Sequence, residues 1–368
     1  MERASARIDF DAVRANCARL KAELGEAELC AVVKADGYGH GADACATAAL
    51  AGGATRLAVA TAGEAEQIGR RFQHVPLLTM GALTAEEVDA AISAGSELAV
   101  WREDSRRLVA ERARAHGHRT RVHVKYDSGM GRLGNRDAAE VLELVRACAA
   151  DPNLEPAGVW THLATADEPD SDFFDEQLGR FEEVASAVKA EHPQVLVHAA
   201  NSAAVLRDRR SHFEMARCGV AIYGLDPFQR DPAEQGLQPA LTLGSHVADV
   251  KRFPAGASAG YGRKWKAPVD TWVGMIPIGY GDGVRRALTN NADVLVQGRR
   301  YPLVGTVSMD NITIDLGPET EVQPGEEAVL IGRQGGEQIL AEEVAHRLET
   351  INYEVTCAIS PRVPRRAA

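Results

Sequence analysis

Eight short apolar runs recur in the first 224 residues of this 368-residue chain, and longer, charged, alanine-rich stretches separate them. The stretches carry helical periodicity, as at 84–93 and 138–149, and Thr84 with Glu87 three residues later is typical of a helix N-terminus. Continuous apolar runs that alternate with helices are typical of parallel strands covered on both faces. The runs are 29–33, 57–60, 76–80, 98–101, 122–126, 157–162, 195–198 and 219–223.

Eight such units predict a (β/α)8 barrel, and a doubly wound open sheet is the alternative. The pattern changes near residue 230, where a polar stretch, 228–239, interrupts it. Runs that favour β-structure follow between Gly and Pro turns, with one candidate helix at 341–349. We therefore expect an α/β barrel domain over residues 10–232. A mainly antiparallel β domain should cover 233–368, and residues 1–9 should join it.

Composition disfavours several classes of protein. Lys and Arg total 41 and Asp and Glu total 52, and the resulting net charge of −11 disfavours nucleic-acid binding. No apolar run approaches the ~20 residues that span a bilayer, and the N-terminus has no apolar signal-peptide core. We expect a cytoplasmic protein without membrane contact. The six cysteines form no C-x-x-C pair, which predicts buried thiols and no metal site.

Lys34 directly follows the first apolar run, and three glycines (37, 39 and 41) come soon after it. In (β/α)8 enzymes the reactive groups lie at the carboxyl ends of the strands. Burial at such a position lowers the pKa of a lysine, and a neutral amine can form a Schiff base with an aldehyde. Glycines let the backbone turn sharply beside a ligand. Taken alone, Lys34 is better explained as a lysine that extends from a strand end into solvent.

The whole segment AVVKADGYGHG (31–41) resembles the cofactor-lysine segment of bacterial alanine racemases. These are pyridoxal 5'-phosphate (PLP) enzymes of fold type III, with a barrel and a β domain. Further segments resemble the same family in the same order, almost to the end of the chain. They are 7–16, 125–134, 160–167, 198–204, 217–224, 260–262, 277–283, 308–310, 351–354 and 359–365.

The resemblance implies racemisation of L-alanine and D-alanine by two bases in a homodimer. Lys34 would bind PLP and act as one base, and Tyr261 of the partner subunit would be the other. Bases on opposite faces of the α-carbon let a proton leave one face and return to the other. Because the ordinary pKa of tyrosine is about 10, Tyr261 needs cationic help, which His162 and Arg132 would provide.

The resemblance also assigns the cofactor contacts. Arg217 would face the ring nitrogen of PLP, supported by His198. A guanidinium only donates hydrogen bonds, so the ring would stay largely unprotonated, and this favours simple proton return over transamination. The implied cofactor-binding residues are Lys34, Tyr38, His162, His198, Ser202, Arg217, Gly219, Val220 and Tyr353. The phosphate contacts among them would be the hydroxyls of Tyr38, Ser202 and Tyr353 and the backbone N–H groups of Gly219 and Val220.

The substrate carboxylate would bind Arg132 and the backbone N–H of the partner subunit's Met309. Lys125 matches a lysine that is carbamylated in many family members, where the carbamate pairs with the arginine and positions it. The physiological role that the resemblance implies is the supply of D-alanine for peptidoglycan.

Other interpretations stay open at this stage. One is a racemase of another or broader set of small amino acids, such as serine. A decarboxylase of the same fold type would need other residues, and a non-catalytic PLP carrier typically lacks the β domain. The chain also departs from the family pattern twice: Asp36-Gly37 replaces an Asn-Ala pair found in some members, and Pro361 stands where proline is unusual. Proline removes a backbone N–H, so it affects the local path of the last segment.

Overall fold

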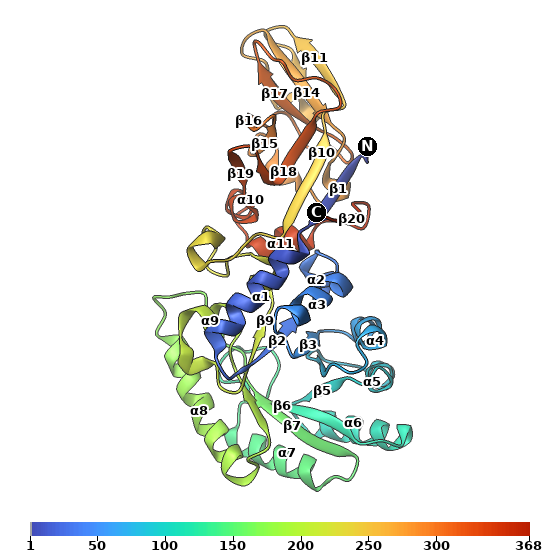
Figure 1. Cartoon of the computed structure of the whole chain (residues 1–368), viewed down its shortest axis with the longest axis vertical. Coiled ribbons are helices and arrows are strands. Elements are labelled where there is room, and N and C mark those ends of the chain that lie inside the picture. Colours follow the sequence, from blue (N-terminus) through green and yellow to red (C-terminus); the bar gives the residue numbers. More distant parts are fainter. Residues whose placement is uncertain (1) are drawn as a thin grey trace. The chain divides into compact units, whose positions relative to one another are not determined.

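The computed structural model describes residues 2–368, and its contacts divide the chain into two compact units. The barrel unit comprises Val13–Tyr38 and Ala42–Ile222. The β unit comprises residues 2–12, Gly39–Gly41 and Tyr223–Ala368. The transition after the barrel thus falls at Tyr223, whereas the sequence favours a boundary at residue 232. Figure 1 labels the elements of both units.

Eight parallel strands close into a barrel in chain order, which confirms the predicted fold and excludes the doubly wound open sheet. The strands are short and mostly buried, as their apolar sequences predict. They are β2 (Glu28–Val32), β3 (Arg56–Val59), β4 (Leu77–Thr79), β5 (Glu97–Val100), β6 (Thr120–Lys125), β7 (Leu154–Trp160), β8 (Leu196–His198) and β9 (Met215–Cys218).

The sequence prediction is wrong for the eighth strand. The apolar run 219–223 is not a strand, because Val220–Tyr223 forms a short 3-10 helix. The strand β9 lies immediately before it, and all four of its residues are buried. Its sequence, Met-Ala-Arg-Cys, contains Arg217, which hides the apolar character of the strand. Because Arg217 interrupts the apolar pattern, the predicted strand began at residue 219, four residues after the start of β9 at Met215.

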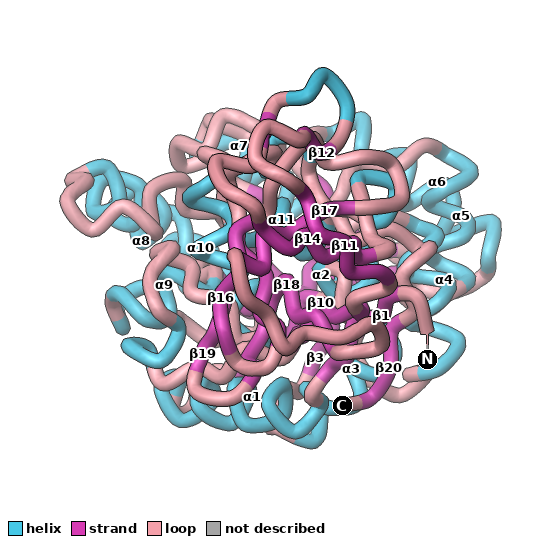
Figure 2. The backbone as a smooth tube through the Cα atoms, turned by 90° about the horizontal axis from the view of Figure 1, so that it is seen from above, coloured by secondary structure: helices cyan, strands magenta, loops and turns pink. Residues whose placement is uncertain are grey.

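Helices cover the outside of the barrel, and α4, α5 and α6 lie side by side along it (Figures 1 and 2). Helix α5 begins as predicted, with a capping box in which Thr84 and Glu87 bond each other's backbone N–H groups. The helices are α1 (Phe10–Leu24), α3 (Ala42–Ala51), α4 (Ala62–Arg71), α5 (Ala85–Ser93), α6 (Glu103–His116), α7 (Ala138–Ala150), α8 (Phe173–Glu191) and α9 (Ser202–Arg207).

A seven-stranded sheet forms the larger part of the β unit. Its strands follow the order β16-β15-β18-β10-β1-β20, with β19 paired to β18. All pairs are antiparallel except β1 with β20, so the first and last strands of the chain are neighbours. The strands are β1 (Ala4–Ile8), β10 (Leu241–His246), β15 (Asp293–Val296), β16 (Arg299–Pro302), β18 (Glu327–Gln334), β19 (Glu337–Ile339) and β20 (Arg365–Ala367).

Two smaller antiparallel sheets and two short helices complete the β unit. One sheet has the order β11-β14-β17 and the other pairs β12 with β13. The helix predicted near residue 341 is present as α10. These elements are β11 (Asp249–Phe253), β12 (Ser258–Ala259), β13 (Trp265–Lys266), β14 (Thr271–Ile276), β17 (Ile312–Gly317), α10 (Ala341–Arg347) and α11 (Asn352–Cys357).

Pro361 occupies a turn that tolerates it. The N–H of Val363 donates to the carbonyl of Ser360 at 3.1 Å, so Pro361 is the second residue of a four-residue turn. Proline is favoured at this position because its φ is already correct and the turn does not use its N–H. The departure from the family pattern therefore costs the last segment no turn hydrogen bond.

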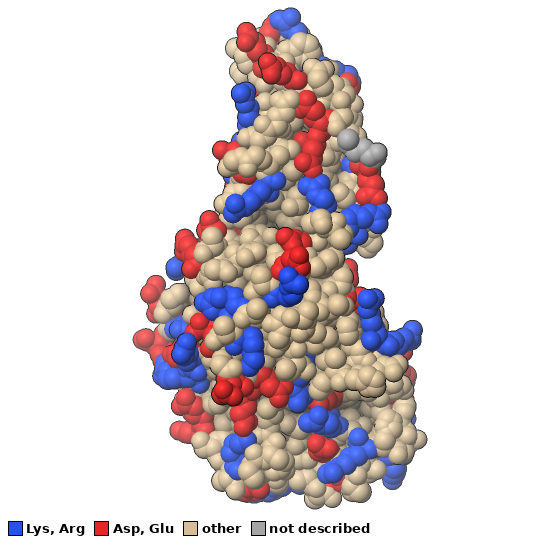
Figure 3. Space-filling model, viewed as in Figure 1, with Lys and Arg blue, Asp and Glu red and all other residues tan. Residues whose placement is uncertain are grey.

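The surface and the cysteines match the expectations in part. Basic and acidic side chains are interspersed on the face shown in Figure 3. Five of the six cysteines are buried as expected, but Cys357 is exposed, contrary to the expectation. None of the helices described between residues 2 and 368 combines the length and hydropathy needed to span a bilayer.

Candidate functional site

Lys34 lies half-buried two residues after the end of β2, at the start of a left-handed turn labelled α2 (Lys34–Tyr38). Residues 35–38 all have φ between +51° and +62°. A left-handed conformation costs a non-glycine residue roughly 1–2 kcal/mol. The turn is fixed from outside, because the N–H of Ala35 donates to Glu64 Oε1 at 2.7 Å. Strained backbone of this kind is concentrated at functional sites, where it places side chains accurately.

Four predicted phosphate-binding residues come together beside this turn. Tyr38 and Ser202 are buried, and a Cβ atom at Gly219 would lie 2.3 Å from the Tyr38 hydroxyl oxygen. The N–H of Gly219 donates to Ser202 Oγ at 3.0 Å, and Val220 follows directly at the start of the 3-10 helix. Ser202, Gly219 and Val220 follow the last two barrel strands, where (β/α)8 enzymes commonly bind phosphate. Tyr38 follows the first strand, β2, which pairs with the last strand, β9.

Arg217, His198 and His162 also come together, as predicted. Arg217 is buried, and its Nη1 donates to His198 Nδ1 at 2.8 Å. Its Nη2 bonds the carbonyl of Thr161 at 2.8 Å and lies 3.3 Å from His162 Nδ1. Burial lowers the pKa of Arg217 to about 10, so the guanidinium still carries its charge at neutral pH. The positive charge is therefore held by several acceptors and not by a carboxylate.

Lys125 lies buried at the end of β6, and its Nζ is 4.1 Å from the centre of the Trp160 ring. Burial, followed by the charges of Arg217 and Arg132, lowers the pKa of Lys125 to about 7. The same causes hold the pKa of His162 well below its ordinary value. Both groups can therefore be neutral near pH 7, because burial and the positive charges around them disfavour a further positive charge.

Arg132 is exposed in the loop that follows β6. Asp127 organises this loop, because its Oδ1 accepts from the N–H of Gly129 at 3.1 Å and of Gly131 at 3.0 Å. The N–H of Asp127 in turn donates to the carbonyl of Asn135 at 2.8 Å, which closes the loop at its base. The loop thus presents Arg132 from a fixed backbone.

The remaining three predicted residues belong to the β unit. Tyr261 lies between Gly260 and Gly262, both of which have positive φ, and its side chain is 73% exposed. Met309 is 51% exposed. Tyr353 lies in helix α11, partly buried. The participation of these residues in the site stays a prediction.

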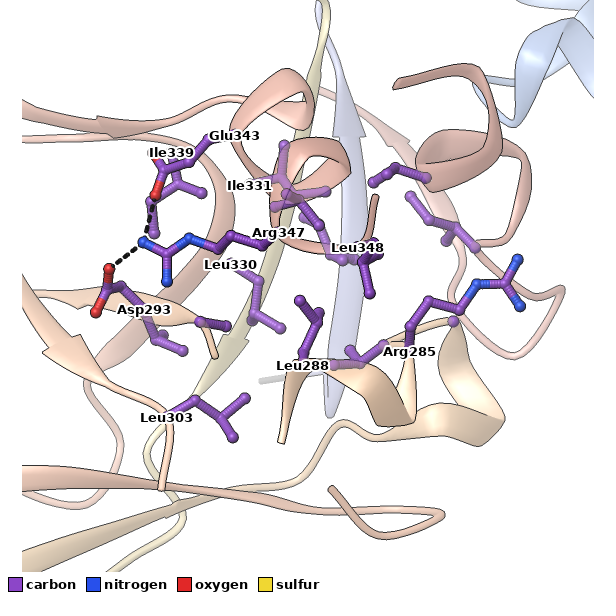
Figure 4. Close-up of a pocket in the computed structure, with 18 residues that line it drawn as sticks. Arg285, Leu288, Asp293, Leu303, Leu330, Ile331, Ile339, Glu343, Arg347 and Leu348 are labelled. Carbon is purple, nitrogen blue, oxygen red and sulfur yellow. Dashed lines mark hydrogen bonds and ion pairs between the residues drawn. The ribbon is translucent and has the colours of Figure 1, made fainter. Parts of the chain in front are cut away.

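The β unit also contains a cavity of about 40 Å³ (Figure 4). Apolar side chains form most of its wall, among them Leu288 and Leu303. The charge of Arg347 is paired with Asp293 at 2.6 Å and Glu343 at 2.8 Å. None of the site residues predicted from the sequence is among the described residues that line it, so we do not assign the reaction to this cavity.

Comparison with known proteins identifies the family. The family model "Alanine racemase, N-terminal domain" matches residues 8–227, and "Alanine racemase, C-terminal domain" matches residues 240–367. The chain belongs to the alanine racemase family. The alanine racemase of Symbiobacterium thermophilum is 41% identical over 98% of this chain and 96% of its own. Alanine racemase 1 of Bacillus subtilis is 40% identical over 98% of this chain and 92% of its own.

Solved structures of alanine racemases agree with this membership. The enzyme of Streptomyces lavendulae, a producer of D-cycloserine, superposes with a TM-score of 0.95 at 34% identity, over 100% of this chain and 97% of its own. A Bacillus anthracis alanine racemase with bound L-Ala-P gives a TM-score of 0.89 at 38% identity, over 99% of this chain and 95% of its own. Both units of the chain therefore have counterparts in one alanine racemase chain.

Sequence analysis of this alanine racemase family member missed three buried residues around the site. Trp160 lies flat against His198, with ring centres 5.6 Å apart and planes at 4°. His123 bonds His198, and Glu97 bonds His123. A signal for the last two was present, since each is a polar residue within or beside an apolar strand segment. Among residues 2–368, no group of three or more His, Cys, Asp and Glu side chains is placed to hold a metal ion.

Proposed function

We propose that this protein interconverts L-alanine and D-alanine with PLP as cofactor, by a two-base mechanism. The observation that carries the proposal is the position of Lys34, on a strained turn at the end of a barrel strand, beside the group formed by Tyr38, Ser202 and Gly219. The similarity of the whole chain to alanine racemases supports the choice of alanine. The alternative is a racemase of another or broader set of small amino acids, such as serine.

The residues present fit PLP. A phosphate needs hydrogen-bond donors, and the hydroxyls of Tyr38 and Ser202 lie beside the backbone of Gly219, where only a residue without a Cβ leaves room. Lys34 Nζ is 6.0 Å from the centre of the Tyr38 ring, so one loop would hold both ends of the cofactor. Val220 N–H is a further proposed phosphate donor. Tyr353, in the β unit, is proposed as another.

When bound, PLP would supply an electron sink that makes the α-proton of the amino acid acidic. Lys34 Nζ would remove or return this proton on one face of the α-carbon. The phenolic oxygen of the partner subunit's Tyr261 would do so on the other face. The high exposure of this tyrosine in the single chain supports a role across a subunit interface.

His162 and Arg132 would lower the cost of a tyrosinate near the site. Because His162 Nδ1 faces Arg217 Nη2, its other nitrogen, Nε2, carries the hydrogen that can be donated onward. A donor within a cluster of positive charges favours an ionised phenol. Arg217 would face the cofactor ring with His198 behind it, and its fixed charge would keep the ring nitrogen largely unprotonated.

The substrate carboxylate would bind Arg132 and the N–H of the partner subunit's Met309. We propose that Lys125 is carbamylated, because its amine can be neutral near pH 7 and a neutral amine is the form that reacts with carbon dioxide. The resulting anion would pair with Arg132 and fix it. A homodimeric, cytoplasmic enzyme that supplies D-alanine for peptidoglycan, without nucleic-acid, membrane or metal contacts, completes the proposal.

The decisive experiment incubates L-alanine with the purified protein and PLP in D₂O. Proton NMR follows loss of the α-proton, and chiral chromatography follows D-alanine. Exchange together with D-alanine formation supports both the substrate and the two-base mechanism. Exchange without D-alanine would mean that only one face works, which would contradict the role of Tyr261 or the shared dimer site. No exchange with alanine, but exchange with another amino acid, would favour the alternative substrate.

A further inference from the structure

Four polar side chains form a hydrogen-bonded row through the interior of the barrel, which we call the Arg217–Glu97 row. Arg217 on β9, His198 on β8, His123 on β6 and Glu97 on β5 are all at most 4% exposed. Arg217 Nη1 lies 2.8 Å from His198 Nδ1, His198 Nε2 lies 2.9 Å from His123 Nδ1, and His123 Nε2 lies 2.6 Å from Glu97 Oε2. Branched apolar residues usually fill such interiors. The polar Arg217–Glu97 row is therefore a specific feature that needs a reason.

Only one protonation pattern satisfies all three hydrogen bonds of the Arg217–Glu97 row. Arg217 can only donate, so His198 Nδ1 must accept and His198 Nε2 must carry the hydrogen. His123 Nδ1 must then accept, and His123 Nε2 carries the hydrogen that the Glu97 carboxylate accepts. A proton added to either imidazole would place two donors against each other. The donor at one end and the acceptor at the other thus fix the tautomers of both histidines.

Two arginines keep the Glu97 carboxylate, at one end of the Arg217–Glu97 row, ionised. Arg56 Nη1 lies 3.1 Å from the Glu97 carboxylate, and Arg121 Nη1 lies 2.6 Å from it. Burial alone would raise the pKa of Glu97, but the hydrogen bond from His123 and these charges outweigh it and lower the pKa. Burial lowers the pKa values of His123 and His198, which agrees with neutral rings.

At the other end of the Arg217–Glu97 row, its neighbours orient the guanidinium group of Arg217. Its guanidinium carbon lies 4.6 Å from the centre of the Trp160 ring, on which His198 also stacks. Trp160 and His198 therefore set the plane and the rotation of the guanidinium group together. If His198 turned its Nδ1–H toward Arg217, this acceptor would become a donor and the guanidinium would have to move.

We propose that Glu97 and His123 are positioning residues for the reaction, which act through His198 to fix the orientation of Arg217. The inference rests on the proposed function, in which Arg217 faces the cofactor ring. Glu97 lies at the first residue of its strand, and the proposed reaction lies at the carboxyl ends of the strands. Glu97, at the start of its strand, thus fixes the tautomers of the two histidines, and through them it affects a residue that faces the carboxyl ends of the strands.

The test compares Glu97→Gln with a matched control, Glu28→Gln. A glutamine at 97 keeps the shape but can either accept from His123 or donate to it, so residue 97 no longer excludes the reversed histidine tautomers. In the reversed form His198 Nδ1–H would face Arg217, which can only donate, and the guanidinium would have to move. Glu28 belongs to the same ion-pair cluster, since its Oε2 accepts from Arg56 Nε at 2.7 Å, but it is not part of the Arg217–Glu97 row. Glu28→Gln therefore removes a carboxylate from the cluster and leaves the histidines unchanged.

The primary measurement needs no cofactor. Two-bond nitrogen–proton NMR correlations of the ¹⁵N-histidine-labelled apoprotein report which ring nitrogen carries the hydrogen. We expect the Nε2–H form for His123 and His198 in the wild type and in Glu28→Gln, and a mixed or reversed form in Glu97→Gln. In the PLP-loaded enzyme, kcat of Glu97→Gln should fall by at least about tenfold, typical of groups that orient a functional residue. The KM for alanine should change little.

Gly158→Ala is a second perturbation for the case in which Glu97→Gln does not fold. A Cβ at this position would lie 2.3 Å from His123 Nδ1, so the ring must shift while every charge is kept. We expect the same loss of the fixed tautomers. Unchanged tautomers in the folded variant, or equal kcat values for Glu97→Gln and Glu28→Gln, would overturn the inference. A wild type that does not racemise alanine would instead contradict the proposed function, and the nitrogen shifts would still decide whether Glu97 fixes the histidines.

Discussion

Replacing Lys125 with methionine should stabilise the apoprotein in carbon-dioxide-free buffer, and the gain should depend on pH. The pKa of Lys125 is lowered from 10.5 to about 7 in the fold. Between these two values the unfolded chain binds more protons than the folded chain, so the stability of the wild type rises as the pH rises. Below pH 7 the full cost of burying the amine is present.

The expected size of the gain follows from the two pKa values. The cost removed by Lys125→Met is about 4 kcal/mol at pH 7, about 3 kcal/mol at pH 8.5 and about 1 kcal/mol at pH 10. The variant also loses the contact of the ammonium with Trp160, which offsets roughly 1–2 kcal/mol at low pH, where the amine is charged. The diagnostic quantity is therefore the decrease of the gain with pH and not its absolute size.

Urea unfolding at these three pH values, followed by tryptophan fluorescence, measures the difference in unfolding free energy. Trp160 lies beside the substituted position and reports on the barrel unit. A difference that stays constant from pH 7 to pH 10 would refute the reasoning, because an ordinary, solvated lysine gives no slope over this range. Added bicarbonate should stabilise the wild type and leave Lys125→Met unchanged if the amine is carbamylated.

Four further predictions concern the proposed reaction. Lys34→Ala should abolish both the absorbance of covalently bound PLP and turnover, and retained racemisation would contradict the mechanism. Tyr261→Phe should impair reaction from the L side more than PLP binding, as kinetics in both directions and cofactor titration would reveal. Mixing the two inactive variants should restore some activity through dimers with one intact shared site; no activity in confirmed mixed dimers would argue against sharing. Gly219→Ala should weaken PLP binding, since its Cβ would collide with the Tyr38 hydroxyl; unchanged affinity by cofactor titration would remove these residues from the phosphate site.

Seven of the eight barrel strands could be predicted from the sequence because each contains or overlaps a recognisable apolar run. The eighth could not, because Arg217 interrupts it. The same physical cause explains why Glu97 and His123 were missed. Apolar patterning identifies strands that are stabilised by burial alone, whereas a buried polar residue is acceptable only through partners that lie far away in sequence. His123 and Glu97 are 26 residues apart, and their hydrogen bond becomes evident only when the barrel closes.

Family motifs predicted which residues of the barrel unit come together, and patterning did not. Lys34 and Tyr38 come from one segment, Ser202 and Gly219 come from two others, and no periodicity links the three segments. Their proximity follows from the closed barrel, which brings the carboxyl ends of the first and last strands side by side: β2 pairs directly with β9. The roles proposed for Tyr261 and Met309 could not be derived in this way, because in the proposal these residues act from a second subunit.

The left-handed turn after β2 limits which sequences can carry the lysine. Asp36 and Gly37 both have positive φ, and aspartate and asparagine tolerate this region better than most residues while glycine enters it freely. The Asp36 carboxylate also accepts from the N–H of Ala42 at 2.9 Å, which ties the turn to the first residue of the next helix. The Asp-Gly pair is therefore not a neutral drift from Asn-Ala. It relieves backbone strain at residue 37, so this protein can hold Lys34 in place with less backbone strain than a chain that has alanine there.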